Sequence, residues 1–155
     1  KNAARSVAST DNIGNAAVAA SILVSSCGAC HAANKVAPTM PALAPPAEST
    51  GIVSHMRAHQ RAVDLMYRGL VAPSDELWTQ GAEAMKAAPL ADKDLPKVSK
   101  GVARFEARVH ELADRAIKAP DHGAKVAIYG EIIGGCANCH GLYGKVWGPG
   151  LPKTE

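Results

Sequence analysis

Two five-residue motifs of the form Cys-x-x-Cys-His constrain this chain more than any other feature of its sequence. The first, CGACH, occupies residues 27–31, and the second, CANCH, occupies residues 136–140. Together they use all four cysteines of the chain. Two cysteines three positions apart on a helical turn point the same way, so both thiols can bond one edge of a planar group while the adjacent histidine lies under its centre.

This pattern is the attachment signature of c-type haem, in which two thiols bond the porphyrin and the histidine binds the iron. We therefore predict two haem c groups as cofactors. The predicted residues are Cys27, Cys30, Cys136 and Cys139 for covalent attachment, and His31 and His140 as proximal iron ligands.

Three alternative roles for the four cysteines fit this chain less well. A four-cysteine zinc ribbon usually separates its two pairs by about 15–20 residues, whereas more than 100 residues separate them here. Redox disulfides of the thioredoxin type do not need a histidine after each pair. A structural disulfide framework would be denser in cysteine for this length.

The composition agrees with a core that is partly non-protein. Only six of the 155 residues are aromatic and 30 are alanine, so large side chains that usually fill a core are scarce. Two porphyrins would supply the missing apolar mass.

The net charge of +3 gives little guidance to partners. Basic residues are dispersed, with no basic run and no aromatic residues between them, which excludes nucleic acid as an expected partner. The residues from Lys100 to Lys118 include a charged stripe at helical spacing that we interpret as a solvated helix face.

Four helices are predicted after a proline-rich linker at residues 36–50. They cover about 52–70, 75–87 and 97–119, and a last helix starts after Pro120 and ends in the second motif. Ser49 or Thr50, Ser74 and Asp121 are the predicted N-caps. The predicted apolar seam of the first of these helices is Ile52, Met56, His59, Val63, Met66 and Leu70.

No segment alternates at period two, so we predict an all-α fold. A small-residue helix leads into the first motif, and the later helices predict a four-helix bundle. We expect residues 1–48 to form an N-terminal haem-binding segment with its linker, and residues 49–155 to form the bundle that carries the second haem. The weakly polar run from Ile13 to Val24 is too short to predict a membrane span.

Residues 52–143 resemble the class II cytochromes c, the group of cytochrome c-prime and cytochrome c-556. The resemblance rests on Met56-x-x-His59 early in the first bundle helix and on the haem motif that ends the last one. It implies a four-helix bundle with a residue of the first helix over the distal face of the haem. The added haem segment at Cys27 departs from single-haem members of that group.

The distal ligands are predicted from the same helix and from its neighbour. His59 is favoured for the second haem, because a histidine on an apolar seam needs a partner for its ring nitrogens. His55, which would serve the first haem, His110 and Met56 are the other candidates. His110 lies beside small alanines on which a porphyrin would rest.

These observations predict a periplasmic electron carrier that is not an enzyme, from which a signal peptide or anchor has been removed. Its expected partners are redox proteins, and the resemblance allows a homodimer. The alternative is a gas-binding or sensing protein with one five-coordinate haem open to a diatomic ligand. A small haem peroxidase is a third hypothesis, and it would need a vacant iron beside an acid-base group.

Overall fold

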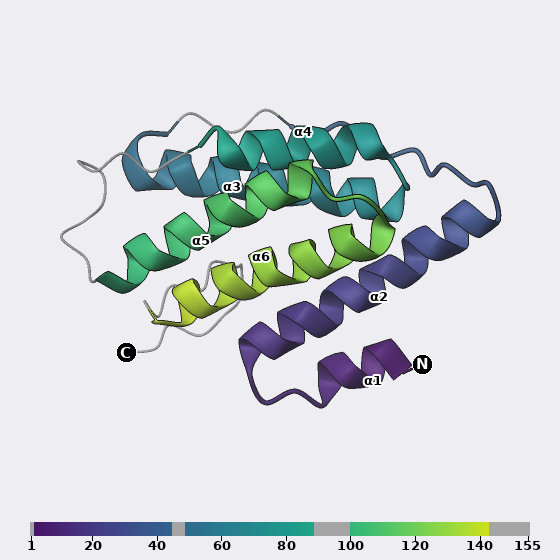
Figure 1. Cartoon of the computed structure of the whole chain (residues 1–155), viewed down its shortest axis with the longest axis horizontal. Helices are drawn as coiled ribbons and strands as arrows, with labels where there is room; N and C mark the ends of the chain where they lie inside the picture. Colours follow the sequence, from purple (N-terminus) through teal and green to yellow (C-terminus); the bar gives the residue numbers. More distant parts are fainter. Residues whose placement is uncertain (1, 45–48, 89–99, 143–155) are drawn as a thin grey trace.

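The structure is a computed structural model that describes residues 2–44, 49–88 and 100–142, without the side chains of residues 100–102 and 142. Within these residues it contains helices and no strand, which confirms the predicted all-α class. The helices are α1 (Asn2–Ala8), α2 (Ile13–Ala33), α3 (Gly51–Val71), α4 (Asp75–Lys86), α5 (Lys100–Ile117) and α6 (His122–Leu142), arranged as in Figure 1.

The helix starts follow the predicted caps. The Ser74 hydroxyl accepts a hydrogen bond from the Leu77 amide at 3.2 Å, and the Asp121 carboxylate accepts one from the Ala124 amide at 2.8 Å. Thr50 occupies the N-cap position of α3 but makes no capping bond through its side chain. The short helix α1 was not predicted.

One main core lies between α3, α4, α5 and α6. Apolar side chains from all four helices meet there, with Met66, Trp78, Leu112 and Ile132 almost fully buried. The Trp78 indole N–H donates to the Ala116 carbonyl at 2.9 Å, which ties α4 to α5. Burial of these side chains supplies the main stabilising free energy of this part of the chain.

The predicted seam of α3 is wrong at its first turn. Ile52 is 41% exposed and Met56 only half-buried, whereas His55, His59, Ala62 and Met66 are buried. The α3 face that meets the other helices therefore starts at His55, which was not part of the predicted seam, and continues through the predicted His59. Of the helix predicted over about 97–119, residues 97–99 lie outside the described part of the chain.

The N-terminal helix α2 packs antiparallel along α6. A Cβ built on Gly14 would lie 2.9 Å from Asn138, and one on Gly130 would lie 2.7 Å from the Ser21 hydroxyl. At the other end of α2, Gly28 faces His122. Small residues thus let the two backbones approach closely along the whole contact.

This antiparallel pairing separates the two motifs. The first motif ends α2 beside the start of α6, and the second ends α6 beside the start of α2 (Figure 1). Cys136 follows His122 by fourteen positions on α6, which is about 21 Å at 1.5 Å per residue. The two motifs therefore occupy opposite ends of one helix pair.

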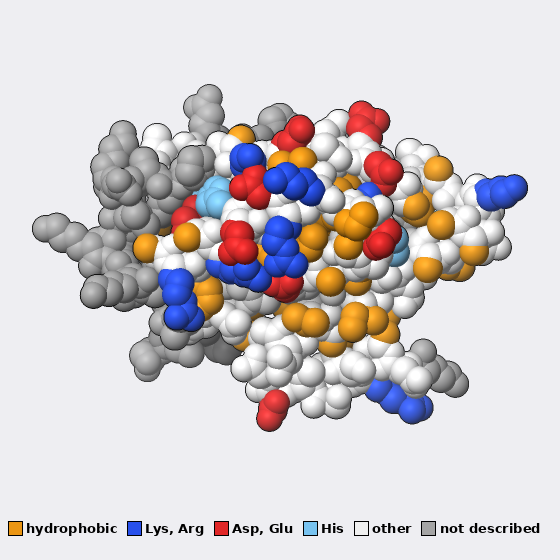
Figure 2. All heavy atoms as spheres, in the orientation of Figure 1, with side chains coloured by type: hydrophobic (Ala, Val, Ile, Leu, Met, Phe, Trp, Pro, Cys, Tyr) orange, Lys and Arg blue, Asp and Glu red, His pale blue; other side chains and the backbone are white. Residues whose placement is uncertain are grey.

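The prediction about membrane spans needs correction. The helix α2 continues through the first motif to Ala33, so it is long and apolar enough to cross a membrane by length and composition alone. Four of its large apolar side chains are exposed, and Figure 2 shows hydrophobic side chains along its course; they are Ile13, Val18, Ile22 and Leu23. Here α2 packs on α1, α3 and α6.

We predict that Gly28→Ala destabilises the folded chain by about 1–3 kcal/mol, the usual cost of inserting a methyl group into a packed contact. The added Cβ would collide with the Leu70 carbonyl oxygen at the end of α3. Urea denaturation followed by far-UV circular dichroism measures the change in the free energy of unfolding.

Gly141→Ala is the matched control, because a Cβ there meets nothing within 4 Å. It is expected to leave stability unchanged or to raise it by up to about 1 kcal/mol through helix propensity. Equal effects of the two substitutions would contradict the close contact between α2 and α3.

Candidate functional site

The first motif lies in the last turns of α2. Cys27 and Cys30 are exposed there, and His31 is half-buried. The helix ends directly after the motif: the Asn34 side-chain amide donates to the Cys30 carbonyl at 2.8 Å, and Lys35 takes a left-handed φ of 55°. The two thiols are therefore presented at the surface on one helix terminus.

The ring of His31 has a defined orientation. Its Nδ1 lies 2.7 Å from the carbonyl oxygen of Val71 at the end of α3. A carbonyl oxygen only accepts hydrogen bonds, so Nδ1 is the protonated nitrogen that donates. The lone pair is then on Nε2, which is the arrangement typical of a metal-ligating histidine.

The second motif lies near the end of α6, where Cys136, Cys139 and His140 are all half-buried. Burial, with smaller contributions from the charges of Cys139 and Glu106, raises the pKa of the Cys136 thiol to about 11. Burial and the charge of Glu106 also raise the pKa of Cys139. The second pair of thiols is therefore less accessible and less acidic than an ordinary cysteine pair.

Three histidines and one glutamate from α3 and α5 form what we call the histidine–glutamate cluster: His55, His59, Glu106 and His110. The Nε2 atom of His55 lies 3.2 Å from the Glu106 carboxylate, and that of His110 lies 2.8 Å from it. The Nε2 atom of His59 lies 4.0 Å from the same carboxylate. The ring centroids of His55 and His59 are 4.0 Å apart.

The cluster is built from two pairs at helical spacing. His55 and His59 are four residues apart on α3, and Glu106 and His110 are four residues apart on α5, so each pair lies on one helix face. The donor atoms of His55, His59 and Glu106 lie within 4.8 Å of one another. Two imidazoles and a carboxylate are a donor set that can hold a divalent transition metal.

His59 has the ring arrangement that His31 shows. Its Nε2 atom is buried and has no hydrogen-bond partner among the described residues, so its hydrogen bond to the Ala88 backbone belongs to Nδ1. Burial, followed by the charge of His55, lowers the pKa of His59 to about 4. The ring is therefore neutral near pH 7, with the Nε2 lone pair ready to bind a metal.

Glu106 is the residue that joins the cluster. Burial would raise the pKa of its carboxyl, but hydrogen bonds from His55 and His110 and the charges of His59 and His55 outweigh burial and lower the pKa to about 2. Glu106 is therefore ionised near pH 7. A Cβ built on Gly135, next to Cys136, would lie 3.9 Å from the Val109 side chain, so the part of α5 that carries His110 lies near the second motif.

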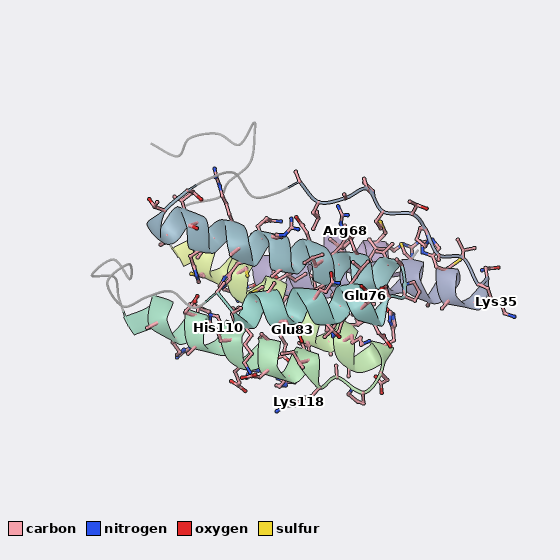
Figure 3. The ribbon with its side chains drawn as sticks, turned by 90° about the horizontal axis from the view of Figure 1, so that it is seen from above. Lys35, Arg68, Glu76, Glu83, His110 and Lys118 are labelled. Carbon is pink, nitrogen blue, oxygen red and sulfur yellow. The ribbon has the colours of Figure 1, made fainter. Side chains whose placement is uncertain are left out.

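The cluster and the first motif are far apart. Figure 3 places His110 and Lys35, which follows the first motif, toward opposite ends of the molecule. Val71, the partner of His31, follows His55 by sixteen positions on α3, which is about 24 Å along the helix. His55, predicted as a ligand for the first haem, thus belongs with the second motif.

The structure brings together three of the four predicted distal candidates. His55, His59 and His110 share the cluster, whereas Met56 is half-buried on α3 and is not one of its members. The sequence analysis missed Glu106. Its spacing of four residues from His110 was a signal, but nothing in the sequence shows that α3 and α5 bring their faces together.

No protein-family model, no curated protein and no solved structure matches this chain. The chemistry of both ends of the molecule is therefore argued from their residues and geometry.

We predict that thiol alkylation of the folded chain before haem attachment is unequal at the two motifs. Cys27 and Cys30 are exposed, whereas the raised pKa and partial burial of Cys136 slow thiolate formation. At pH 7.5, iodoacetamide should modify Cys27 and Cys30 at least about tenfold faster than Cys136, since one pKa unit is a tenfold change in thiolate.

Peptide mass spectrometry over a time course measures the four rates. The same chain in 8 M urea is the control, and there the four rates should converge. Equal rates in the folded chain would contradict the burial of the second motif.

Proposed function

We propose that this chain is a dihaem c-type cytochrome that transfers electrons between redox partner proteins in the periplasm or an equivalent oxidising compartment. The observation that carries the proposal is that both Cys-x-x-Cys-His motifs lie at helix ends beside histidine rings suited to binding iron. The absence of a charged run on the chain agrees with protein partners rather than nucleic acid.

The residues of the first end fit a haem. Cys27 and Cys30 are exposed on the last turns of α2, with no disulfide between them. The Val71 carbonyl holds the Nδ1 proton of His31 and so fixes the tautomer that leaves Nε2 for iron. Exposed Leu23 precedes Cys27 by one helical turn, which adds apolar surface next to the thiols.

The residues of the second end fit a haem as well. Cys136 packs against the main core, so a group bonded to it would enter the space between the helices. The buried, unpartnered Nε2 of His59 is a costly feature unless something binds it. We propose His140 as the proximal ligand of this haem and His59 as the distal ligand, with His110, His55 and Met56 as weaker candidates.

The arrangement of the last four helices supports the likeness to class II cytochromes c. The helices α3 to α6 share one core, and α6 ends in the haem motif while α3 supplies histidines near that motif. We propose that this part is a four-helix bundle of the cytochrome c-prime kind, to which α2 adds a second haem segment.

Each haem, when bound, supplies an iron that changes oxidation state by one electron. The protein supplies fixed imidazoles, a low-dielectric core and a separation between the two sites. Because the motifs lie at opposite ends of the α2–α6 pair, each end offers a separate place for a partner to dock. That geometry suits a carrier that serves two partners.

We predict two haem groups per chain, measured as the reduced pyridine haemochrome relative to protein. Cys136→Ala/Cys139→Ala should lose one of the two, and Cys27→Ala/Cys30→Ala should lose the other. Unchanged haem content in either double variant would contradict attachment at that motif.

Carbon monoxide added to the dithionite-reduced protein tests the distal ligands. If side chains cap both irons, as proposed, the spectrum stays unchanged. If one haem binds carbon monoxide rapidly and fully, the gas-binding alternative replaces the electron-carrier proposal.

We predict that His59→Ala converts one of the two haems from low-spin to high-spin, because the iron loses its sixth ligand. Optical and electron paramagnetic resonance spectra of the ferric protein measure the change. His122→Ala is the matched control, because that ring bonds the Ser25 hydroxyl near the first motif and should leave both haems low-spin. An unchanged spectrum of His59→Ala would rule out His59 as the ligand.

A further inference from the structure

The carboxylate of Glu106 has an unusual position for an acidic side chain. Its side chain is 17% exposed and lies among three histidine rings. The surface glutamates of α5 and α6, Glu111 and Glu131, instead pair with the exposed Arg108. Glu106 therefore differs from these surface glutamates in joining three histidines of two helices.

We propose that Glu106 is a positioning residue for the distal histidine of the second haem and that its negative charge lowers the midpoint potential of that haem. The proposal rests on the proposed function, because it assigns a role at the same site. It names a residue on α5 whose effect reaches the iron through the histidines of α3.

The positioning part follows from the contacts. Glu106 holds Nε2 of His55 at 3.2 Å, and the His55 ring lies against the His59 ring with centroids 4.0 Å apart. The His110 ring also meets the His59 ring edge-on, with centroids 5.6 Å apart, and Glu106 holds Nε2 of His110 at 2.8 Å. One carboxylate thus holds both rings that contact His59.

The electrostatic part follows from burial. The side chains of His55 and His59 are only 5% and 8% exposed, so the surroundings of the carboxylate screen its charge weakly. A negative charge near iron stabilises the ferric state more than the ferrous state, since the ferric centre carries one more positive charge. The Glu106 oxygen lies 4.0 Å from Nε2 of His59, which is close enough for this attraction to count.

The first end of the molecule lacks this feature in the described structure. The group that orients His31 is the uncharged carbonyl of Val71. The two proposed haem sites therefore differ in the group nearest to a ligand histidine. At the first site it is an uncharged carbonyl, and at the second it is a carboxylate. Removing that charge should move one potential and leave the other unchanged.

The test is a spectroelectrochemical titration of the full dihaem protein, wild type against Glu106→Gln. The substitution keeps the shape of the side chain and removes its charge. We expect an upward shift of one midpoint potential with the other unchanged, and altered g-values for one low-spin ferric haem in electron paramagnetic resonance. Glu106→Asp keeps the charge and should return the potential toward the wild-type value.

Glu111→Gln is the matched control, because it makes the same change on α5 at an exposed position. It should move neither potential. If Glu106→Gln keeps both haems and neither potential moves, the proposal is overturned. If Glu106→Gln and Glu111→Gln shift the same potential equally, the effect is one of net charge and the proposal is again overturned.

A variant that keeps the carboxylate covers the case in which Glu106→Gln does not fold. His110→Asn removes the ring that donates a hydrogen bond to Glu106 and keeps the carboxylate, so one potential should fall. An unchanged potential there would count against the proposal. Failure of the proposed function itself would give a different result, because the wild-type chain would then hold no haem at the second motif.

Discussion

The close antiparallel contact between α2 and α6 determines the layout of the whole molecule. Gly14, Ser21 and Gly28 recur every seven residues on α2, and all three are buried. That spacing keeps one face of α2 against α6 for its full length, with Gly130 opposite Ser21. Because each helix ends in a Cys-x-x-Cys-His motif and the helices run in opposite directions, the two motifs lie apart. A parallel contact would have placed the two motifs side by side at one end of the helix pair.

The sequence alone was sufficient to predict the features that depend on residues close together in the chain. The caps at Ser74 and Asp121, the helices that follow them and the two motifs depend on residues within a few positions of one another. The first turn of α3 was predicted wrongly because Ile52 looks like a core residue, yet the buried face starts at His55. Glu106 could not be assigned, since its role depends on a meeting of α3 and α5 that no local pattern encodes. The opposite placement of the motifs likewise follows from packing between distant segments.

His31 and His59 have the same hydrogen-bonding arrangement at the two ends of the molecule. Each ring gives its Nδ1 proton to a backbone carbonyl, and each keeps Nε2 for another partner. A backbone carbonyl is a convenient second partner, because it is held by a helix end or a turn and cannot change protonation state. The two ends differ in what contacts the ring, since Glu106, His55 and His110 surround His59 at the second end. The first end thus orients its histidine by a backbone carbonyl, whereas the second end contains the histidine–glutamate cluster.

The unequal burial of the two motifs also has a consequence for how such a protein is made. A group can be joined to the thiols of α2 after the chain has folded, because that helix end is open at the surface. The thiols of α6 lie partly within the packing of α3 to α6, so under the proposed function haem would reach them more readily before that core closes. Maturation at the second motif would then be coupled to folding. A chain that closed too early would be left half-assembled, with its surface site complete and its interior site empty.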